Sequence, residues 1–151
     1  MSPALDLDIG GVEPAASLEP RLRGAVRRTI ETGPLDGPPL EQAELSVTLL
    51  SADDMRHLNR RFHDVDAPTD VLAFHLGPVR DGAERSLLGD VYVCPDVARG
   101  SARELGIDVH DEVVRLVIHG VLHLLGHDHP EGEERYESDM FRLQERLLEE
   151  A

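Results

Sequence analysis

Several kinds of residue are scarce in this chain of 151 residues. It has no Trp, two Tyr, three Phe and one Cys, and all of its basic residues are Arg. An aromatic fraction of 3% argues against a nucleic-acid surface built from stacked aromatic side chains. The single Cys94 excludes an internal disulfide, and its place at the end of an apolar run predicts a small buried side chain. One unpaired cysteine also fits a cytosolic protein.

Long hydrophobic segments are absent as well. The apolar runs are interrupted by His and Arg and are too short to span a bilayer. The N-terminal residues lack a charged segment followed by an apolar one, so we expect no signal peptide, no membrane partner and a cytoplasmic location. The net charge of -15 argues against a generic nucleic-acid binder and against a DNA partner, because an acidic surface repels phosphate.

The order of the predicted elements indicates an α+β fold in a single domain spanning residues 1–151. We expect a small mixed sheet of about four strands packed with five or so helices, one of them central and buried. The predicted strands are Ala4–Ile9, Glu44–Ser51, Asp70–Phe74 and Leu87–Cys94. The predicted helices are Ser17–Glu31, Asp53–Phe62, Pro95–Gly106, Asp108–Leu125 and Glu133–Glu150, with loops over 33–39, 63–68 and 77–86.

Three of these helices carry specific expectations. Ser17 and Asp108 are predicted N-caps, and Pro95 suits a first helical position because its missing N–H is not needed there. The last helix is expected to bury one stripe of side chains and to expose its acids. The predicted stripe consists of Tyr136, Met140, Leu143 and Leu147.

The most informative stretch is Val113–His129, which reads VVRLVIHGVLHLLGHDH. His119 and His123 are four residues apart, so they share one face of a helix. Gly126 can take a positive φ and end that helix, which allows His129 to turn back towards the other two histidines. Metzincin metalloproteases use the same spacing to place three imidazoles on one zinc ion.

This spacing predicts a catalytic metal site with His119, His123 and His129 as ligands. Three protein ligands leave the fourth tetrahedral position of zinc open for water. The alternative is a set of hydrogen-bonded core histidines. In metalloproteases a Glu that acts as general base follows the first histidine, whereas here that residue is Gly120, which disfavours peptidase chemistry.

The histidine block resembles the signature of the YbeY endoribonucleases, which is HGxLHLxG followed by an aromatic residue or His and then DH. Two further blocks are similar to that family and occur in the same order, so that the resemblance covers about half of the chain. Leu58-Asn59 with Asp66–Phe74 resembles LN…D.PTDVLSF, and Leu87–Val91 resembles LLGDI.

The resemblance implies a single-strand-specific, metal-dependent endoribonuclease that acts in 16S rRNA 3′-end maturation and ribosome quality control. It assigns His119, His123 and His129 to one Zn2+ ion, in agreement with the spacing. The implied partners are single-stranded RNA or the 16S rRNA precursor, and the small ribosomal subunit. The acidic composition adds a basic ribosomal protein through which the chain would reach RNA.

Two positions depart from the family pattern. The family often has a functional arginine after the aromatic residue of the LN block, but here Phe62 is followed by His63. The cation of the site would then be His63 when protonated, or Arg61 or Arg60, and the alternative is that these are solvated helix residues. The serine of the family's PTDVLSF is Ala73 here, so no hydroxyl chemistry can depend on it.

We expect metal-assisted hydrolysis of a phosphodiester, with the general base unassigned among three carboxylates. Asp70 would be the base or cap a turn, and Asp90 would be the base or terminate strand pairing. Asp128 is predicted to orient a ligand imidazole, with catalysis as its second possibility. His127 is expected to be a solvent-exposed neighbour of the site, with a proton shuttle as the alternative.

Two other functions compete with the nuclease. A zinc peptidase would share the three-histidine ligand set, and Gly120 is the feature against it. A non-catalytic ribosome-assembly factor would use its metal structurally, with His127 or Asp128 as a fourth protein ligand.

Overall fold

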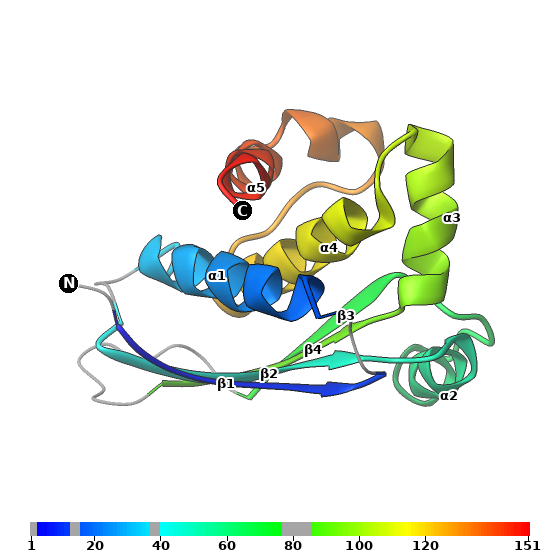
Figure 1. Ribbon diagram of the computed structural model, residues 1–151, viewed down its shortest axis with the longest axis horizontal. Helices are drawn as coiled ribbons and strands as arrows, with labels where there is room; N and C mark the ends of the chain where they lie inside the picture. The colour runs from blue at the N-terminus through cyan, green and yellow to red at the C-terminus, as the bar shows by residue number, and fades with distance from the viewer. Residues whose placement is uncertain (1–2, 13–15, 37–39, 77–85) are drawn as a thin grey trace.

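The computed structural model describes residues 3–12, 16–36, 40–76 and 86–151. These residues form an α+β fold around a four-stranded mixed sheet, as predicted, with the strand order β1-β2-β4-β3 (Figure 1). The strands are β1 (Ala4–Gly11), β2 (Gln42–Leu49), β4 (Ser86–Val93) and β3 (Val71–His75). The first three strands in this order are parallel, and β3 pairs antiparallel with β4 at the edge of the sheet.

Side-chain alternation gives each strand one face towards the core. In β1, Leu5, Leu7 and Ile9 pack against the core while Asp6 and Asp8 are exposed, which explains the strict alternation of that segment. In the central strands β2 and β4 the inward residues include Leu45, Val47, Val91 and Val93, all buried. The sheet therefore presents one continuous apolar face to the helices.

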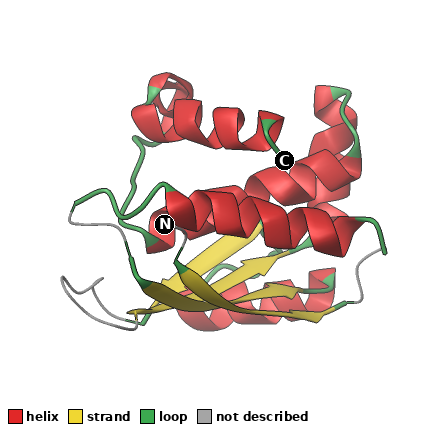
Figure 2. Ribbon diagram, turned by 60° about the vertical axis from the view of Figure 1, so that its left-hand side comes forward, coloured by secondary structure: helices red, strands yellow, loops and turns green. Residues whose placement is uncertain are grey.

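Helices cover the two faces of the sheet unequally. The helices α1 (Leu18–Glu31), α3 (Pro95–Leu105), α4 (Val109–Leu124) and α5 (Asp139–Glu149) lie on one side (Figures 1 and 2). The helix α2 (Ala52–His63) lies on the other side, where rings of its last turn contact Phe74 of β3.

The helix α4 is the centre of the fold, as its apolar sequence predicted. It contacts α1, α3, α5, β3 and β4. Gly120 is the point of closest approach to the sheet, since an added Cβ would lie 2.6 Å from Cγ1 of Val91 and 3.1 Å from its Cγ2. The missing side chain at this position therefore allows the helix to lie against β4.

Both ends of α4 follow from local chemistry. Asp108 is the N-cap, and its carboxylate accepts a hydrogen bond from the His110 N–H at 2.8 Å. At the other end Gly126 has a φ of +93°, a left-handed conformation that side chains disfavour, and the chain turns there towards His129. Both features agree with the prediction.

The last predicted helix is wrong in its first part. A short 3-10 helix, η1 (Gly132–Glu137), is followed by Ser138 in extended conformation with φ of -72° and ψ of 155°. Ser138 caps the shorter helix α5 by accepting from the Phe141 N–H, so Tyr136 does not belong to its buried stripe and is 52% exposed. The prediction followed the periodicity across a capping residue that starts a new helix.

Three smaller predictions have different outcomes. Ser17 occupies the N-cap position of α1 but makes no capping hydrogen bond with its side chain. Pro95 begins α3, and Cys94 is buried, as expected. The loop predicted over 77–86 lies almost wholly outside the described residues, as does the end of the loop over 33–39. In the described part of the chain, no helix has the length and hydrophobicity needed to cross a bilayer.

The packing at Gly120 can be tested with a matched glycine. Ala normally stabilises a helix interior by about 1 kcal/mol relative to Gly. We expect this gain for Gly24→Ala, because Gly24 is an exposed residue of α1 with nothing within 4 Å of an added Cβ. Gly120→Ala should instead destabilise the protein by about 1–2 kcal/mol, because Val91 must move. Denaturant unfolding of both variants measures the difference, and equal stabilisation would disprove the close contact.

Candidate metal centre

Three histidines come together at the C-terminal end of α4. His119 and His123 lie on adjacent turns, and the turn at Gly126 brings His129 to the same point. The Nε2 atoms of His119 and His123 are 3.1 Å apart, and one nitrogen of each of the three rings lies within 4.8 Å of the others. The structure therefore assembles the ligand set that the spacing predicted.

A hydrogen bond from α5 orients the first imidazole. Nδ1 of His119 lies 2.7 Å from Oε1 of Gln144, a side chain that is only 4% exposed. The amide nitrogen of Gln144 faces a carboxylate oxygen of Glu145 at 3.4 Å, which leaves its oxygen for His119. Nδ1 of His119 therefore carries the proton, and the lone pair of Nε2 points towards the other two histidines.

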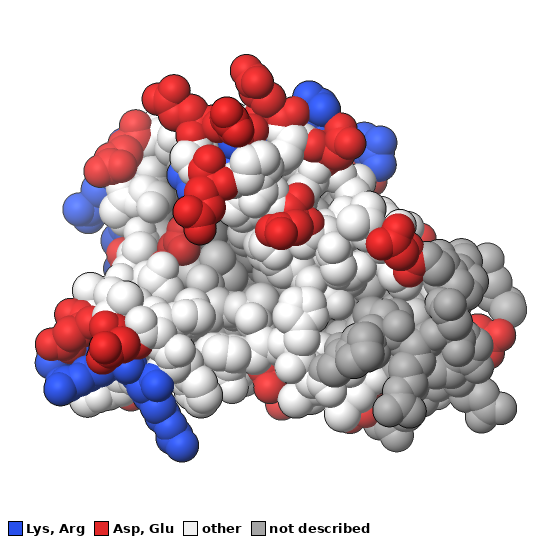
Figure 3. Space-filling model, turned by 180° about the vertical axis from the view of Figure 1, so that it is seen from behind, with Lys and Arg blue, Asp and Glu red and all other residues white. Residues whose placement is uncertain are grey.

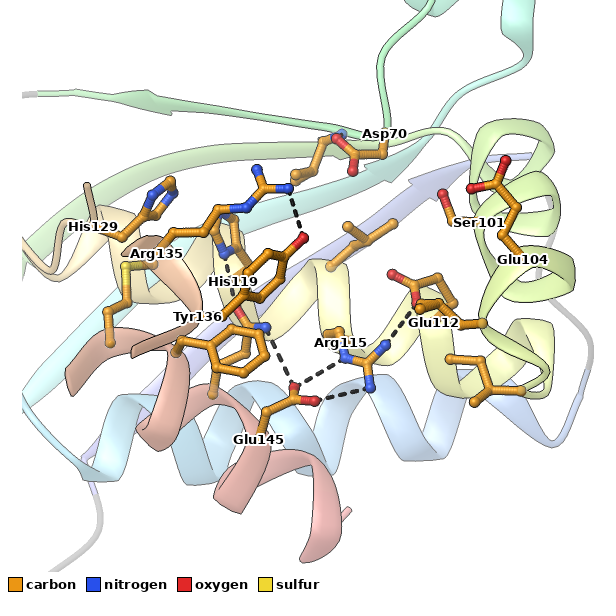
Figure 4. A pocket seen from close by; sticks show the side chains of 17 residues that line it. Asp70, Ser101, Glu104, Glu112, Arg115, His119, His129, Arg135, Tyr136 and Glu145 are labelled. Atoms are coloured by element: carbon orange, nitrogen blue, oxygen red, sulfur yellow. Dashed lines mark hydrogen bonds and ion pairs between the residues drawn. The ribbon is translucent and has the colours of Figure 1, made fainter. Parts of the chain in front are cut away.

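An ion-pair network holds Gln144 and Glu145 in place. Arg115 of α4 donates two hydrogen bonds to Glu145, both of 2.9 Å, and a third of 2.8 Å to Glu112. Glu112 is buried, and burial raises the pKa of its carboxyl group while Arg115 opposes that effect. This network joins α4 to α5 behind the histidines (Figure 4).

The third histidine is oriented by its own loop. Nδ1 of His129 lies 2.9 Å from the carbonyl oxygen of Pro130, so it donates a hydrogen bond there and Nε2 remains unprotonated. The backbone N–H of His129 donates to the Asp128 carboxylate at 2.8 Å. Asp128 therefore stabilises the backbone of the loop that carries this ligand.

The pKa values of His119 and His123 are both lowered. Burial, together with the neighbouring His119 and His129, lowers the pKa of His123 to about 4. Burial is also the main cause of the lowered pKa of His119. Neutral imidazole is the form that binds metal, so the site is ready for a cation at neutral pH.

The donor set fits zinc. Two Zn–N bonds of about 2.0–2.1 Å in a tetrahedral arrangement separate their nitrogens by roughly 3.4 Å. The 3.1 Å between Nε2 of His119 and Nε2 of His123 is close to that value. Three nitrogen donors, two of them in rings with fixed tautomers, would hold such an ion and leave one position for an exogenous ligand.

The histidines border a pocket of about 690 Å³. Its walls come from β3, α3, α4, η1 and α5, and Figure 4 shows Asp70 opposite Arg135 and Tyr136. His119 and His129 line the pocket, as do the carboxylates of Asp70, Glu104, Glu112 and Glu145. A substrate in this pocket would contact both the metal ligands and charged side chains.

Comparisons with known proteins identify the family of this chain. Residues 15–151 match the family model described as Endoribonuclease YbeY. The chain belongs to the YbeY family. A protein of Salinispora tropica named Endoribonuclease YbeY is 50% identical over 116 residues, which are 70% of this chain and 73% of that protein. One from Nocardia farcinica with the same name is 44% identical over 115 residues, covering 72% of this chain and 61% of that protein.

The fold of the family is seen in a solved relative. The solution structure of TM1509 from Thermotoga maritima matches with a TM-score of 0.64 and 31% identity, covering 95% of this chain and 87% of that one. The recognition of the YbeY family from the three sequence blocks is thus confirmed. Because the match to several curated relatives covers less than two thirds of their length, their activity is considered below as a proposal.

The predicted cation of the site lies outside the pocket. His63 stacks with Phe74 at a centroid distance of 6.3 Å, and the guanidinium of Arg61 lies 5.4 Å from the ring of Phe62. Phe74 also contacts Tyr92, which alternates with the inward-facing Val91. The side chains of α2 that were predicted to act are therefore on the face of the sheet opposite to α4.

The three candidate bases lie in different places, and one of them lines the pocket. Asp90 faces away from α4, where it is paired within the sheet and accepts a hydrogen bond from the Ser46 hydroxyl, so it does not terminate pairing. Asp128 is exposed, and its described hydrogen bond is to a backbone N–H and not to an imidazole. Asp70 lines the pocket and also accepts from the Val71 N–H at 2.7 Å, the local contact expected of a turn cap.

His127 differs from its predicted solvent-exposed position. Burial lowers the pKa of its ring, which also bonds the backbone of Gly33. Its Nε2 is buried and has no hydrogen-bond partner among the described residues. The ring packs beside the loop that follows α1 and does not line the pocket.

Sequence reasoning missed Gln144 and Arg135. Gln144 is 25 residues from His119, and a buried glutamine between leucines of an amphipathic helix is the signal that could have revealed it. Arg135 lies in the part of the last predicted helix that the structure replaces with η1, where its guanidinium faces the pocket (Figure 4).

Gln144→Leu tests the orientation of His119. The substitution keeps the buried volume but removes the acceptor of Nδ1, so we expect zinc affinity to fall about 10–100-fold. A competition titration against a chromogenic chelator measures the affinity, and thermal unfolding of the metal-free variant checks its fold. Unchanged affinity would show that Gln144 does not orient the ligand.

The lowered pKa of His123 predicts a pH-dependent stability of the metal-free protein. Between its usual value of 6.5 and about 4, His123 is protonated in the unfolded chain but not in the folded one. The free energy of unfolding should therefore decrease as the pH falls through this range. Urea unfolding at several pH values should show a smaller decrease in His123→Asn, and the same decrease in both proteins would contradict the prediction.

Proposed function

We propose that this protein is a single-strand-specific, metal-dependent endoribonuclease of the cytoplasm that acts in 16S rRNA 3′-end maturation and ribosome quality control. The observation that carries the proposal is the cluster of three imidazoles, with His119 held in one tautomer by Gln144, beside a pocket. The endoribonuclease names of relatives up to 50% identical support RNA as the substrate class.

We assign one Zn2+ ion to His119, His123 and His129. One ring nitrogen of each histidine lies within 4.8 Å of the others, and imidazole is a preferred donor for zinc. When bound, the ion supplies a Lewis acid and makes water nucleophilic near neutral pH.

Asp70 is the best-placed general base. Among the described residues, Val71 N–H and the Thr69 hydroxyl donate to Oδ1 of Asp70, and the other oxygen has no partner. In the proposed hydrolysis a water oxygen bonds to phosphorus while the bond from phosphorus to the leaving ribose oxygen breaks. Asp70 accepts the proton of the water, and solvent protonates the leaving oxygen.

The recessed site supports a preference for single strands. The pocket lies between β3 and the helices, so a phosphodiester reaches the histidines only if its strand leaves a regular duplex. Base-paired RNA offers its backbone on the outside of a stiff helix, whereas an unpaired strand can be splayed into a pocket. A preference for single strands suits an enzyme that cleaves unpaired ends of rRNA.

Arg61 and His63 retain a proposed role outside the pocket. They lie at the C-terminal end of α2, beyond the edge strand β3, where RNA that leaves the pocket would pass. Positive side chains at this place can neutralise backbone phosphate.

The acidic surface supports binding to the ribosome through a basic ribosomal protein and not through RNA alone. Figure 3 shows many acidic and a few basic side chains over the upper part of the rear face, and acidic and basic side chains together at its lower left corner, where α2 lies. With a net charge of -15, the protein would be attracted to a basic ribosomal protein on the small subunit. Binding to purified small subunits that weakens with salt and needs a protein component would support this partner.

Cleavage of a single-stranded RNA tests the activity directly. The zinc-loaded wild type should cut the RNA and leave a matched duplex intact, whereas His123→Ala should be inactive. His110→Ala is the matched control, since His110 is in the first turn of α4 and away from the pocket, and it should retain wild-type activity. The three proteins are purified in parallel, so that activity from a contaminating ribonuclease would appear in all of them.

Other outcomes would favour the competing functions. Peptide hydrolysis that is lost in His123→Ala, with RNA left intact, would identify a zinc peptidase. Inactivity of the wild type towards both substrates, with zinc still bound, would favour a ribosome-assembly factor with a structural metal.

A further inference from the structure

Arg135 is the pocket arginine that pairs with no carboxylate among the residues that the structure describes. The pocket has two arginines, and Arg115 is held by Glu145 and Glu112. Arg135 forms no ion pair with any acidic residue that the structure describes. Arg135 lines the same pocket as His119 and His129.

The guanidinium of Arg135 is held in place by aromatic residues. Its Nη2 donates a hydrogen bond of 2.8 Å to the Tyr136 hydroxyl, and its Cζ lies 4.9 Å from the centre of the Tyr136 ring. That ring meets Phe141 of α5 edge-on, at a centroid distance of 5.2 Å and an angle of 89°. An exposed arginine is thereby given a defined orientation towards the pocket, opposite Asp70 (Figure 4).

We propose that Arg135 binds a non-bridging oxygen of the phosphate at the cleaved bond, and that the Tyr136 hydroxyl positions its guanidinium for this contact. The inference rests on the proposed ribonuclease function. A guanidinium presents several N–H donors in a planar fork that matches phosphate oxygens, and Arg135 uses one donor on Tyr136. Negative charge that develops on the phosphoryl oxygens is then stabilised from the side opposite the general base.

Kinetics of four variants test this role. Arg135→Gln should lower kcat on a short single-stranded RNA by about 100-fold, as the loss of one oriented donor does elsewhere. Arg135→Lys should restore part of the activity, and Tyr136→Phe, which keeps the ring, should lose about tenfold. Arg142→Gln is the matched control, because Arg142 is an exposed arginine paired with Asp139 outside the pocket, and it should behave as wild type.

A binding measurement separates this inference from the proposed activity. The salt dependence of affinity for a labelled single-stranded RNA reports phosphate contacts, each of which contributes a slope of about 0.7. Arg135→Gln should reduce the slope by that amount, and Arg142→Gln should not. Equal slopes and equal kcat in wild type and Arg135→Gln would overturn the role of Arg135 while leaving the nuclease intact.

The other failures are also distinguishable. If the wild type binds RNA but cleaves none, the nuclease proposal fails, and a reduced salt slope in Arg135→Gln would still support the phosphate contact. If the wild type binds no RNA, both proposals are overturned. Equal zinc content and melting temperature in all variants exclude a loss of folding as the cause.

Discussion

The contact between α4 and β4 at Gly120 determines the position of the whole site. Because residue 120 has no side chain, the helix lies against Val91, with His119 directly before this contact and His123 three residues after it. A larger residue would move the helix and both histidines relative to Asp70, which directly precedes β3. The site thus depends on a packing constraint one residue away from its first ligand.

The same contact explains why the general base of metalloproteases is missing here. A Glu at position 120 would point into Val91 and could not reach the pocket, since even a methyl group would be 2.6 Å from Cγ1. The ligand spacing can therefore be shared with peptidases while the chemistry is not. The proposed carboxylate, Asp70, directly precedes the edge strand β3, and the proposed cation, Arg135, belongs to η1.

Local patterns predicted the elements of this fold, and long-range contacts were beyond them. The alternation in β1, the Asp108 cap and the turn at Gly126 each depend on neighbouring residues, so they could be read from the sequence. The strand order, the Gln144 contact and the place of α2 depend on which surfaces meet, which periodicity does not encode. The assignment of Arg61 and His63 to the site had the same weakness, because adjacency in a motif does not specify a face of the sheet.

The sequence of the C-terminal segment shows how one capping residue changes a functional interpretation. A continuous helix would have directed Tyr136 into the core and Arg135 to solvent. Ser138 starts a new helix instead, and the preceding turn of 3-10 helix places Arg135 beside the histidines. The proposed metal ligands, base and cation are consequently drawn from four separate segments that only the tertiary structure unites.

The most direct test of this account is the coordination of the ion in the zinc-loaded protein, measured by X-ray absorption at the zinc edge together with a crystal structure. The account predicts one ion bound by His119, His123 and His129, with an exchangeable solvent molecule as the fourth ligand. A fourth protein ligand such as His127 or Asp128 would close the site and contradict a catalytic role for the metal.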